Sequence, residues 1–414
     1  MQTQLADFIR DTPEGREAGE ILRKCVHCGF CTATCPTYQL LGDELDGPRG
    51  RIYLIKQVLE GAEPTAKTRL HLDRCLTCRS CESTCPSGVH YSRLLDIGRH
   101  VVDARVPRRG KDALVRRALR EFVPRPALFG LAMKAGRAVR GLLPKTLQDK
   151  VPTLRPAGRW PTPRHARRVI ALAGCAQPAM APSINASAAR VLDALGISMV
   201  ESAGAGCCGA VRFHLDDLEG ARADARRNID AWWADIDAGR VEAIVMTASG
   251  CGVQVRDYAH LLQHDPAYAE RAQRVSALTR DIAEVVAAEA APLQALLAAH
   301  PQPRQKLAWH APCTLQHGQR IRGTVESLLG AAGYELTLVR DPHLCCGSAG
   351  TYSILQPELS AQLRANKLDS LLAGGAGHIA SANIGCIGHL QAGTEVPVMH
   401  WIELLDSRLG TADA

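Results

Sequence analysis

The sequence predicts an α+β multidomain protein in which a helical, cysteine-rich domain precedes two duplicated α/β domains. Three observations carry this prediction. Two four-cysteine runs lie near the N-terminus, eight further cysteines repeat with a common spacing, and strand-like segments alternate with alanine-rich helical segments around that repeat. The chain has 414 residues, which is enough for two or three domains.

The helical domain is defined by two runs of the pattern Cys-x2-Cys-x2-Cys-x3-Cys-Pro, the first ending at Pro36 and the second at Pro86. This spacing is typical of bacterial-type ferredoxins, where three cysteines of a run hold one [4Fe–4S] cluster and the fourth reaches the other. The predicted ligands are therefore, for one cluster, Cys25, Cys28, Cys31 and Cys85, and for the other, Cys75, Cys78, Cys81 and Cys35.

Zinc and disulfides are the alternatives for these eight cysteines. Zinc ribbons use Cys-x2-Cys pairs rather than four-cysteine runs that end in Cys-Pro, and nothing in the sequence indicates the oxidising compartment that disulfides require. His27 lies inside the first run, where we expect it to face solvent or to tune a cluster potential by hydrogen bonding. Between the runs, apolar spacing predicts a helix over Arg49–Leu59, entered by a turn at 48–51.

Positive charge is concentrated between Arg105 and Arg168. This segment holds eighteen lysines and arginines and three acidic residues, a net charge of +15 in a chain of +7. From Leu114 to Leu143 the cations alternate with apolar residues, which is compatible with an amphipathic helix on an anionic membrane, with docking on an acidic partner, or with a solvated connector. No nucleic-acid motif accompanies the charge, so nucleic acid is not an expected partner.

The N-terminal segment lacks an apolar signal core, and no run reaches eighteen apolar residues. We therefore expect neither a signal peptide nor a transmembrane helix. Many cysteines in ligand spacing, without an export signal, predict a reducing cytoplasm.

The remaining cysteines form two copies of one pattern, here called the first and second repeats. Thirty-one residues separate Cys175 from Cys207, and the same number separate Cys313 from Cys345. Each of these spacings ends in Cys-Cys-Gly, where the glycine allows an unusual turn that brings both sulfurs to one centre. A metal, a cluster or redox-active thiols are the candidate uses, and buried structural cysteines are the alternative. The candidate residues are Cys175, Cys207, Cys208, Cys251, Cys313, Cys345, Cys346 and Cys386.

Both repeats show the same succession of elements. We predict strands over 168–174, 243–250, 306–310 and 378–385, and helices over 187–195, 218–231, 324–332 and 357–372. This alternation favours a parallel sheet in each repeat, with ligands at the strand C-termini. The expected domain limits are 1–104 for the ferredoxin-type domain, 105–166 for the basic linker, and 167–298 and 304–408 for the two α/β domains.

These motifs resemble those of proteins with the cysteine-rich CCG domain, named for Cys-Cys-Gly. Such proteins include heterodisulfide reductases, anaerobic glycerol-3-phosphate dehydrogenase and lactate-utilisation proteins. Two ferredoxin runs followed by two CCG domains are most similar to the family of glycolate oxidase iron–sulfur subunits. The resemblance spans nearly the whole chain and is sharpest over KCVHCGFCTATCPTY (24–38), CLTCRSCESTCPSGV (75–89), CCGSAGTYS (345–353) and SANIGCIGHLQ (381–391).

The resemblance implies an electron-transfer subunit of a flavin-dependent 2-hydroxy-acid dehydrogenase complex, with no catalytic residue of its own. It implies partner subunits that bear FAD and oxidise glycolate to glyoxylate, the quinone pool as acceptor, and two [4Fe–4S] clusters with a further cluster or zinc in the CCG domains. It also implies a peripheral position on the cytoplasmic side of the inner membrane. The alternatives are an iron–sulfur subunit for lactate utilisation or anaerobic glycerol-3-phosphate oxidation, and a thiol reductase like heterodisulfide reductase.

The sequence departs from the fuller CCG pattern at one position in each repeat. Gln254 and His389 stand where domains that build a non-cubane cluster have a fifth cysteine. This departure argues against a non-cubane cluster and against disulfide reduction. His310 and His389 are candidate additional ligands of the second repeat, with a structural role as the alternative.

Overall fold

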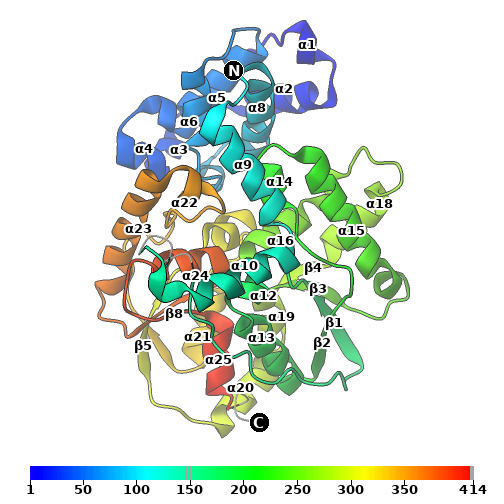
Figure 1. The fold of residues 1–414 in the computed structure, drawn as a ribbon, viewed down its shortest axis with the longest axis vertical. Helices are drawn as coiled ribbons and strands as arrows, with labels where there is room; N and C mark the ends of the chain where they lie inside the picture. The colour runs from blue at the N-terminus through cyan, green and yellow to red at the C-terminus, as the bar shows by residue number, and fades with distance from the viewer. Residues whose placement is uncertain (145–147, 149–150, 411–414) are drawn as a thin grey trace. The chain divides into compact units, whose positions relative to one another are not determined.

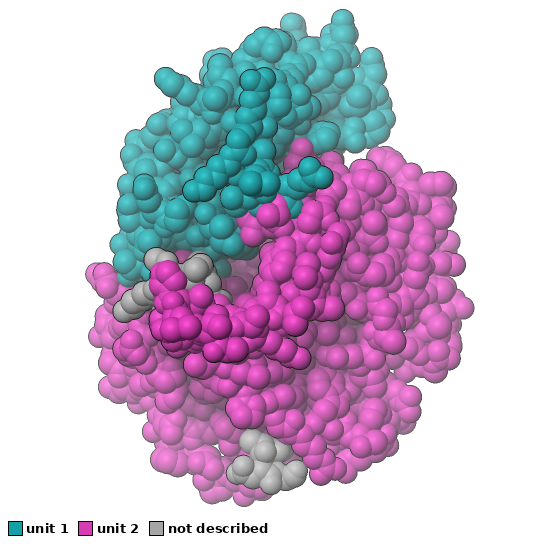
Figure 2. Space-filling view, in the orientation of Figure 1, with its two compact units in different colours: residues 1–117, 341–367 teal, residues 118–340, 368–414 magenta. Residues whose placement is uncertain are grey.

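The computed structural model describes residues 1–144, 148 and 151–410 (Figure 1). Contacts divide the chain into two compact units (Figure 2). Unit 1 consists of residues 1–117 and 341–367, and unit 2 of residues 118–340 and 368–414. The domain limits expected from the sequence stay predictions.

Unit 1 is helical. Its helices are α1 (Asp7–Arg10), α2 (Pro13–Lys24), α3 (Phe30–Ala33), α4 (Pro36–Leu41), η1 (Glu44–Asp46), α5 (Pro48–Leu59), α6 (Ala66–Asp73), α7 (Ser80–Thr84), α8 (Tyr91–Arg105) and α22 (Tyr352–Leu355). Two more helices, α9 (Gly110–Phe122) and α23 (Pro357–Leu372), cross the limits of the units. The helix predicted over 49–59 is confirmed as α5, which begins at Pro48, a favoured first residue because its missing N–H would be unpaired there.

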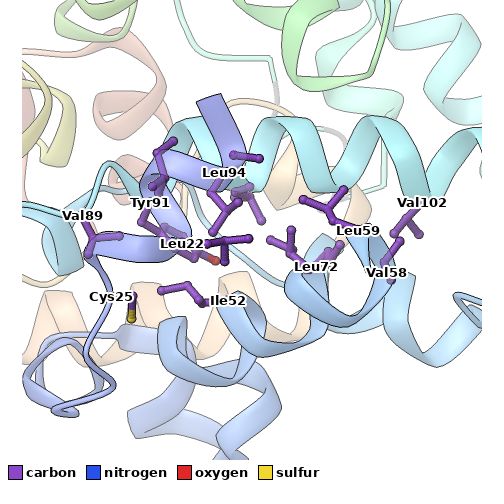
Figure 3. Close-up of a cluster of buried hydrophobic side chains, with 14 of the residues drawn as sticks. Leu22, Cys25, Ile52, Val58, Leu59, Leu72, Val89, Tyr91, Leu94 and Val102 are labelled. Atoms are coloured by element: carbon purple, nitrogen blue, oxygen red, sulfur yellow. The ribbon is translucent and has the colours of Figure 1, made fainter. Parts of the chain in front are cut away.

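The core of unit 1 lies where α8 packs on α2 and α5. Leu22 and Leu94 are fully buried in this core, and Cys25 lies at its edge (Figure 3). Gly98 of α8 faces Ile55 of α5, and a Cβ atom on Gly98 would lie 2.6 Å from Ile55 Cγ1. Glycine therefore lets the two helices that flank the cysteine runs approach closely.

Unit 2 contains two parallel sheets with the same strand order. In the first repeat the order is β2-β1-β3-β4, and in the second it is β6-β5-β7-β8. The strands are β1 (Arg167–Ala171), β2 (Ile197–Glu201), β3 (Ala243–Met246), β4 (Thr279–Asp281), β5 (Gln305–Trp309), β6 (Tyr334–Leu336), β7 (His378–Ser381) and β8 (Val398–His400). The prediction of a parallel sheet in each repeat is confirmed, and the identical order supports duplication.

Three of the four helices predicted for the repeats lie in unit 2, as α13, α15 and α21, and the fourth, over 357–372, is α23, which crosses the limits of the units. The described helices of unit 2 are α10 (Pro126–Ala138), η2 (Arg140–Leu142), α12 (Gln177–Met180), α13 (Ser183–Ala194), α14 (Ala210–His214), α15 (Leu218–Asp237), α16 (Ser249–Arg256), α17 (Tyr258–Leu261), α18 (Ala269–Leu278), α19 (Ile282–Ala288), α20 (Ala290–Ala299), the π-helix η3 (Thr314–Gly318), α21 (Thr324–Ala331), α24 (Ile384–Gln391) and α25 (Trp401–Arg408).

The two repeats pack on each other through equivalent helices. The helix after the first strand of one repeat contacts the helix after the last strand of the other, so α13 packs on α25 and α21 packs on α19 (Figure 1). A buried ion pair between Arg190 of α13 and Asp406 of α25 joins one of these contacts. His400 Nε2 lies 2.8 Å from the carbonyl oxygen of Thr247, which links β8 to the end of β3.

Three predicted strands are too long, and the first of them, β1, ends at Ala171 rather than at residue 174. β3 ends at Met246 and β7 at Ser381, so Gly250 and Gly385 lie in helices α16 and α24 rather than at strand ends. The chain turns from strand to helix over small and polar residues, and tertiary packing overrides their weak helical propensity. The last cysteine of each repeat, Cys251 in the first and Cys386 in the second, therefore lies in the first turn of a helix.

Among the residues that the structure describes, no single helix has the length and apolar composition to cross a membrane. The pair α19 and α20 meets that criterion only when taken together, across a bend of 80°.

Candidate metal centres

Two cavities in unit 1 receive the thiols of the two ferredoxin-type runs. The run-1 cavity is lined by Cys25, Cys28, Cys31 and Cys85, and Cys81 also reaches it. The run-2 cavity is lined by Cys35, Cys75, Cys78 and Cys81. Each cavity thus has three thiols from one run and at least one from the other, and each contains the set of four that the spacing predicts. The cavities are adjacent, since Pro48 and Tyr91 line both.

Both runs wrap around their cavities with the same backbone. Two residues after its first cysteine, each run has a positive φ, which is +54° at His27 and +52° at Thr77. Four residues after that cysteine φ is positive again, +87° at Gly29 and +59° at Arg79. Non-glycine residues pay a conformational cost in this region. Three non-glycine residues adopt it here because the left-handed turns aim successive thiols inward.

The buried thiols are poorly suited to remain without a cation. Burial raises the pKa of Cys25, and that of Cys31 to about 11, with neighbouring thiols adding to both shifts. Burial also raises the pKa of Cys81 well above its ordinary value. A bound metal reverses this trend, because a coordinating thiol loses its proton. Eight convergent thiols around two adjacent cavities fit a pair of four-thiolate iron–sulfur clusters.

A buried polar network borders the run-2 cavity. Arg51 is fully buried, donates to Thr37 Oγ1 at 3.2 Å, and pairs with the buried Asp46 at 3.4 Å. Thr37 Oγ1 in turn lies 3.3 Å from Cys35 Sγ. Tyr91 donates its hydroxyl to Cys75 Sγ over 3.6 Å. Hydrogen bonds of this kind orient ligands and tune the potential of a cluster.

Sequence reasoning placed Arg51 in the turn that enters the predicted helix, gave it no role, and missed Asp46 and Tyr91. One signal was available, because Arg51 lies one helical turn from Ile55 on the apolar face of α5. A cation on such a face has to find buried partners. In the run-1 cavity, the Nε2 atom of His27 is buried with no hydrogen-bond partner in the described part of the chain. Burial, with a contribution from Arg49, lowers the pKa of His27.

In unit 2 the structure brings together all four cysteines of the first repeat. Cys175 follows β1, Cys207 and Cys208 precede α14, and Cys251 lies in α16. Hydrogen bonds link Cys175 to Cys207, Cys207 to Cys208, and Cys208 to Cys251. The pKa of Cys207 is lowered, because Cys175 and Cys208 donate to its sulfur, and the N–H of Gly209 lies 3.4 Å from the same sulfur.

Two buried side chains hold the Cys-Cys-Gly backbone of the first repeat. Asn228 donates to the carbonyl oxygen of Cys207 at 2.8 Å, and the hydroxyl of Tyr258 donates to that of Cys208 at 2.9 Å. Asn228 also bonds the Tyr258 hydroxyl at 3.0 Å. Sequence reasoning missed both residues, because they carry no local pattern. Asn228 lies 21 residues from Cys207 along the chain, and Tyr258 lies 50 residues from Cys208.

The second repeat repeats the local geometry. Gly347 has φ +88°, as Gly209 has +89°, and its N–H lies 3.4 Å from Cys345 Sγ. A Cβ atom on Gly347 would come within 2.6 Å of the Ser360 carbonyl oxygen, so only glycine fits. Cys345 and Cys346 belong to unit 1, where Tyr352 donates to the carbonyl oxygen of Arg74 at 3.2 Å.

Cys313 and Cys386 belong to unit 2, together with both candidate histidines. The ligand atoms of His310 and Cys386 are buried and lie within 4.8 Å of each other. His310 Nδ1 lies 2.9 Å from Ser381 Oγ, which fixes the orientation of the ring. Asn383 donates to Cys386 Sγ at 3.5 Å. His389 is buried on α24.

Family models match both parts of the chain. Residues 21–89 match the 4Fe-4S dicluster domain, and residues 169–256 and 307–391 match the cysteine-rich domain CCG. The first match includes all eight cysteines of the two runs, and the second includes the four cysteines of each repeat.

Similar proteins are found along the full length. The chain is 54% identical over 411 residues to a glycolate oxidase iron–sulfur subunit of Escherichia coli, covering 99% of each chain. It is 29% identical to a probable glycolate oxidase iron–sulfur subunit of Bacillus subtilis, covering 95% of this chain and 94% of the other. A lactate utilization protein A of Exiguobacterium is 26% identical over 56% of this chain and 94% of its own.

A solved structure of a hypothetical protein from Helicobacter pylori shares the fold. Its TM-score is 0.52 with 11% sequence identity, over 96% of this chain and 73% of that chain.

Proposed function

Because this chain belongs to the family of glycolate oxidase iron–sulfur subunits, we propose that it carries electrons from a partner flavoprotein, which oxidises glycolate to glyoxylate, toward quinone. Glycolate oxidation releases two electrons and two protons to the flavin. Electrons then pass through this chain one at a time, because one-electron transfer is the chemistry that bound iron–sulfur clusters supply.

The observation that carries the proposal is the grouping of thiols in unit 1. Each of two adjacent cavities takes three thiols from one run and at least one from the other. We propose as ligands of one [4Fe–4S] cluster Cys25, Cys28, Cys31 and Cys85, and of the second Cys35, Cys75, Cys78 and Cys81. The chain's own part is to hold the clusters close together and to donate hydrogen bonds to their sulfur ligands, as Tyr91 does at Cys75.

The four thiols of the first repeat support a further metal centre, a cluster or a zinc ion. All four are linked by hydrogen bonds, and those that Cys207 accepts hold its pKa below the ordinary value. In the second repeat the candidate ligands are Cys313, Cys345, Cys346 and Cys386, with His310 beside Cys386. The residues Gln254 and His389 in place of fifth cysteines argue against disulfide reduction as the main activity.

A peripheral position on the cytoplasmic side of the inner membrane is part of the proposal. Helix α10 and the η2 turn after it expose an apolar stripe of Leu128, Leu131, Val139 and Leu142. No acidic residue lies between Phe122 and Pro144, while this span holds four lysines and arginines. An apolar stripe with cationic flanks suits the surface of an anionic bilayer.

Co-purification with the flavin-bearing subunits tests the electron-transfer role. Adding glycolate to the anaerobic complex should reduce the clusters, and electron paramagnetic resonance measures that reduction. This chain alone should not oxidise glycolate. Lactate serves as the comparison substrate, because the weaker similarity to lactate utilization proteins names it as the second candidate. Glycolate turnover by the isolated chain, or clusters that stay oxidised in the complex, would contradict the proposal.

A further inference from the structure

The two ferredoxin-type runs differ sharply in exposure at equivalent positions. The residue after the first cysteine is Val26 in the first run, 68% exposed, and Leu76 in the second, 4% exposed. The residue before the third cysteine is Phe30 in the first run, 60% exposed, and Ser80 in the second, 1% exposed. The first run therefore presents large apolar side chains to solvent where the second run is buried.

These apolar side chains surround an accessible thiol. Cys28 lies between Val26 and Phe30 in the chain and is exposed, whereas its counterpart Cys78 is half-buried. All three residues line the run-1 cavity. Exposing a valine and a phenylalanine together costs free energy in water, and a contiguous patch of this kind commonly marks an interaction site.

The position of the patch indicates the kind of partner. Electron transfer between proteins needs the two redox centres to approach closely, and the run-1 cavity is the one whose loop reaches solvent. Two exposed cations, Arg23 and Lys24, directly precede this loop. A partner with an apolar centre and an acidic rim would match the patch and be steered to it.

We infer that Val26, Cys28 and Phe30 form the docking surface for the flavin-bearing partner subunit, and that electrons enter the chain there. The inference rests on the proposed electron-transfer function. One electron leaves the reduced flavin of the partner, whose proton goes to solvent, and reduces the cluster held at the run-1 cavity. The second electron follows the same route after the first has moved on to the run-2 cavity.

The test compares variants of the docking surface in the reconstituted complex. Phe30→Glu places a charge in the patch, and Phe30→Ser installs the residue of the second run. Leu70→Glu is the matched control, because Leu70 is 40% exposed in unit 1 and lines neither cavity. The measurements are the dissociation constant for the flavin subunit, the rate of cluster reduction by glycolate, and the resonance spectrum of the reduced clusters.

Phe30→Glu should weaken binding of the flavin subunit and slow cluster reduction at least tenfold, and Phe30→Ser should do so to a lesser degree. The dithionite-reduced spectrum should be unchanged in both, and Leu70→Glu should behave as the wild type. Unchanged binding and reduction rates, or slowing only of electron exit to quinone, would overturn the inference.

Hydrogen exchange of the wild-type chain gives a readout that needs no variant to fold. Adding the flavin subunit should protect the amides of residues 23–33 more than those of residues 73–83. If glycolate reduces the clusters of the wild-type complex while residues 23–33 stay unprotected, the docking surface is wrong and the proposed function stands. If glycolate fails to reduce the wild-type clusters, the proposed function itself fails.

Discussion

Tyr91 and Cys75 are joined by a hydrogen bond of 3.6 Å from the tyrosine hydroxyl to the cysteine sulfur. Tyr91 opens α8, is buried, and lines both cavities, so it stands where the two cluster sites meet. Burial raises the pKa of Tyr91 well above its ordinary value, with the nearby Cys75 thiol adding to the shift, so the hydroxyl keeps its proton to donate.

Replacing Tyr91 by phenylalanine should lower the potential of the cluster at the run-2 cavity. A hydrogen bond to a ligating sulfur stabilises the more negative, reduced state of the cluster. Its loss should therefore lower the reduction potential by about 20–60 mV, where about 59 mV corresponds to a tenfold change in the equilibrium constant of a one-electron reduction. A redox titration followed by electron paramagnetic resonance measures the shift. Tyr53→Phe, an exposed tyrosine on α5, is the control. An unchanged potential would show that the hydroxyl does not act on the cluster.

Two neighbouring arginines of α5 should differ strongly in their contribution to stability. Arg51 is buried with Asp46, so Arg51→Met should cost about 3–5 kcal/mol of unfolding free energy by breaking a buried pair. The side chains of Arg49 and Glu44 are each 39% exposed, so Arg49→Met should cost about 0–1 kcal/mol. Urea unfolding of the cluster-loaded protein compares the two variants. Equal losses would contradict the assignment of Arg51 to the core network.

Asp281 should make the stability of unit 2 depend on pH. Asp281 is buried and caps the N-terminus of α19. Its carboxylate accepts from the Ala283 amide at 3.0 Å and from Gln319 Nε2 at 3.1 Å. Burial raises its pKa from the ordinary 3.8 to about 7. The folded state therefore holds the proton more tightly than the unfolded state, and the stability contributed at low pH is lost as pH rises from about 4 to about 7.

Asp281→Asn should remove this loss. The wild type should lose about 1–2 kcal/mol through this group between about pH 5.5 and about pH 7.5, and the variant should not. Asparagine keeps the helix cap, and the unpaired Oε1 atom of Gln319 can accept from its amide after a flip of the glutamine. Urea unfolding at several pH values is the measurement. Parallel pH curves for the two proteins would contradict the raised pKa.

Leu131 should contribute to membrane binding if α10 lies on the bilayer. Leu131→Glu should reduce co-sedimentation with anionic vesicles by about fivefold to tenfold, since it replaces about 1–2 kcal/mol of apolar burial with a repelled charge. Leu338→Glu is the control, because Leu338 is also exposed to solvent but lies outside α10. Binding that ignores lipid charge and added salt would point instead to a protein partner for this helix.

The predicted and missed strands differ in their place in the sheets. The four strands found from the sequence are β1, β3, β5 and β7, which are the central strands of the two sheets. Their inner residues form continuous apolar runs, as in Ala243–Met246, because both faces are covered. The missed strands β2, β4, β6 and β8 are all edge strands, and three of them have only three residues of mixed polarity, too few for such a run.

The same distinction separates the parts of the candidate sites. The thiols of each ferredoxin-type run were predictable, because a spacing of two or three residues sets which side chains one loop can aim at one centre. The partners of Arg51, Tyr91, Asn228 and Tyr258 were not predictable, because they lie far along the chain and only packing brings them together.

By itself the sequence determined that two cysteine runs of ferredoxin spacing precede a duplicated cysteine repeat, because short-range spacing is covalent geometry. Only the tertiary structure decided that Val26 and Phe30 are exposed while Leu76 and Ser80 are buried. The two loops share positive φ at equivalent positions, so this difference in exposure comes from long-range packing and not from the loops themselves. Local spacing specified which thiols can converge on one centre, and long-range packing specified which of the two loops faces solvent.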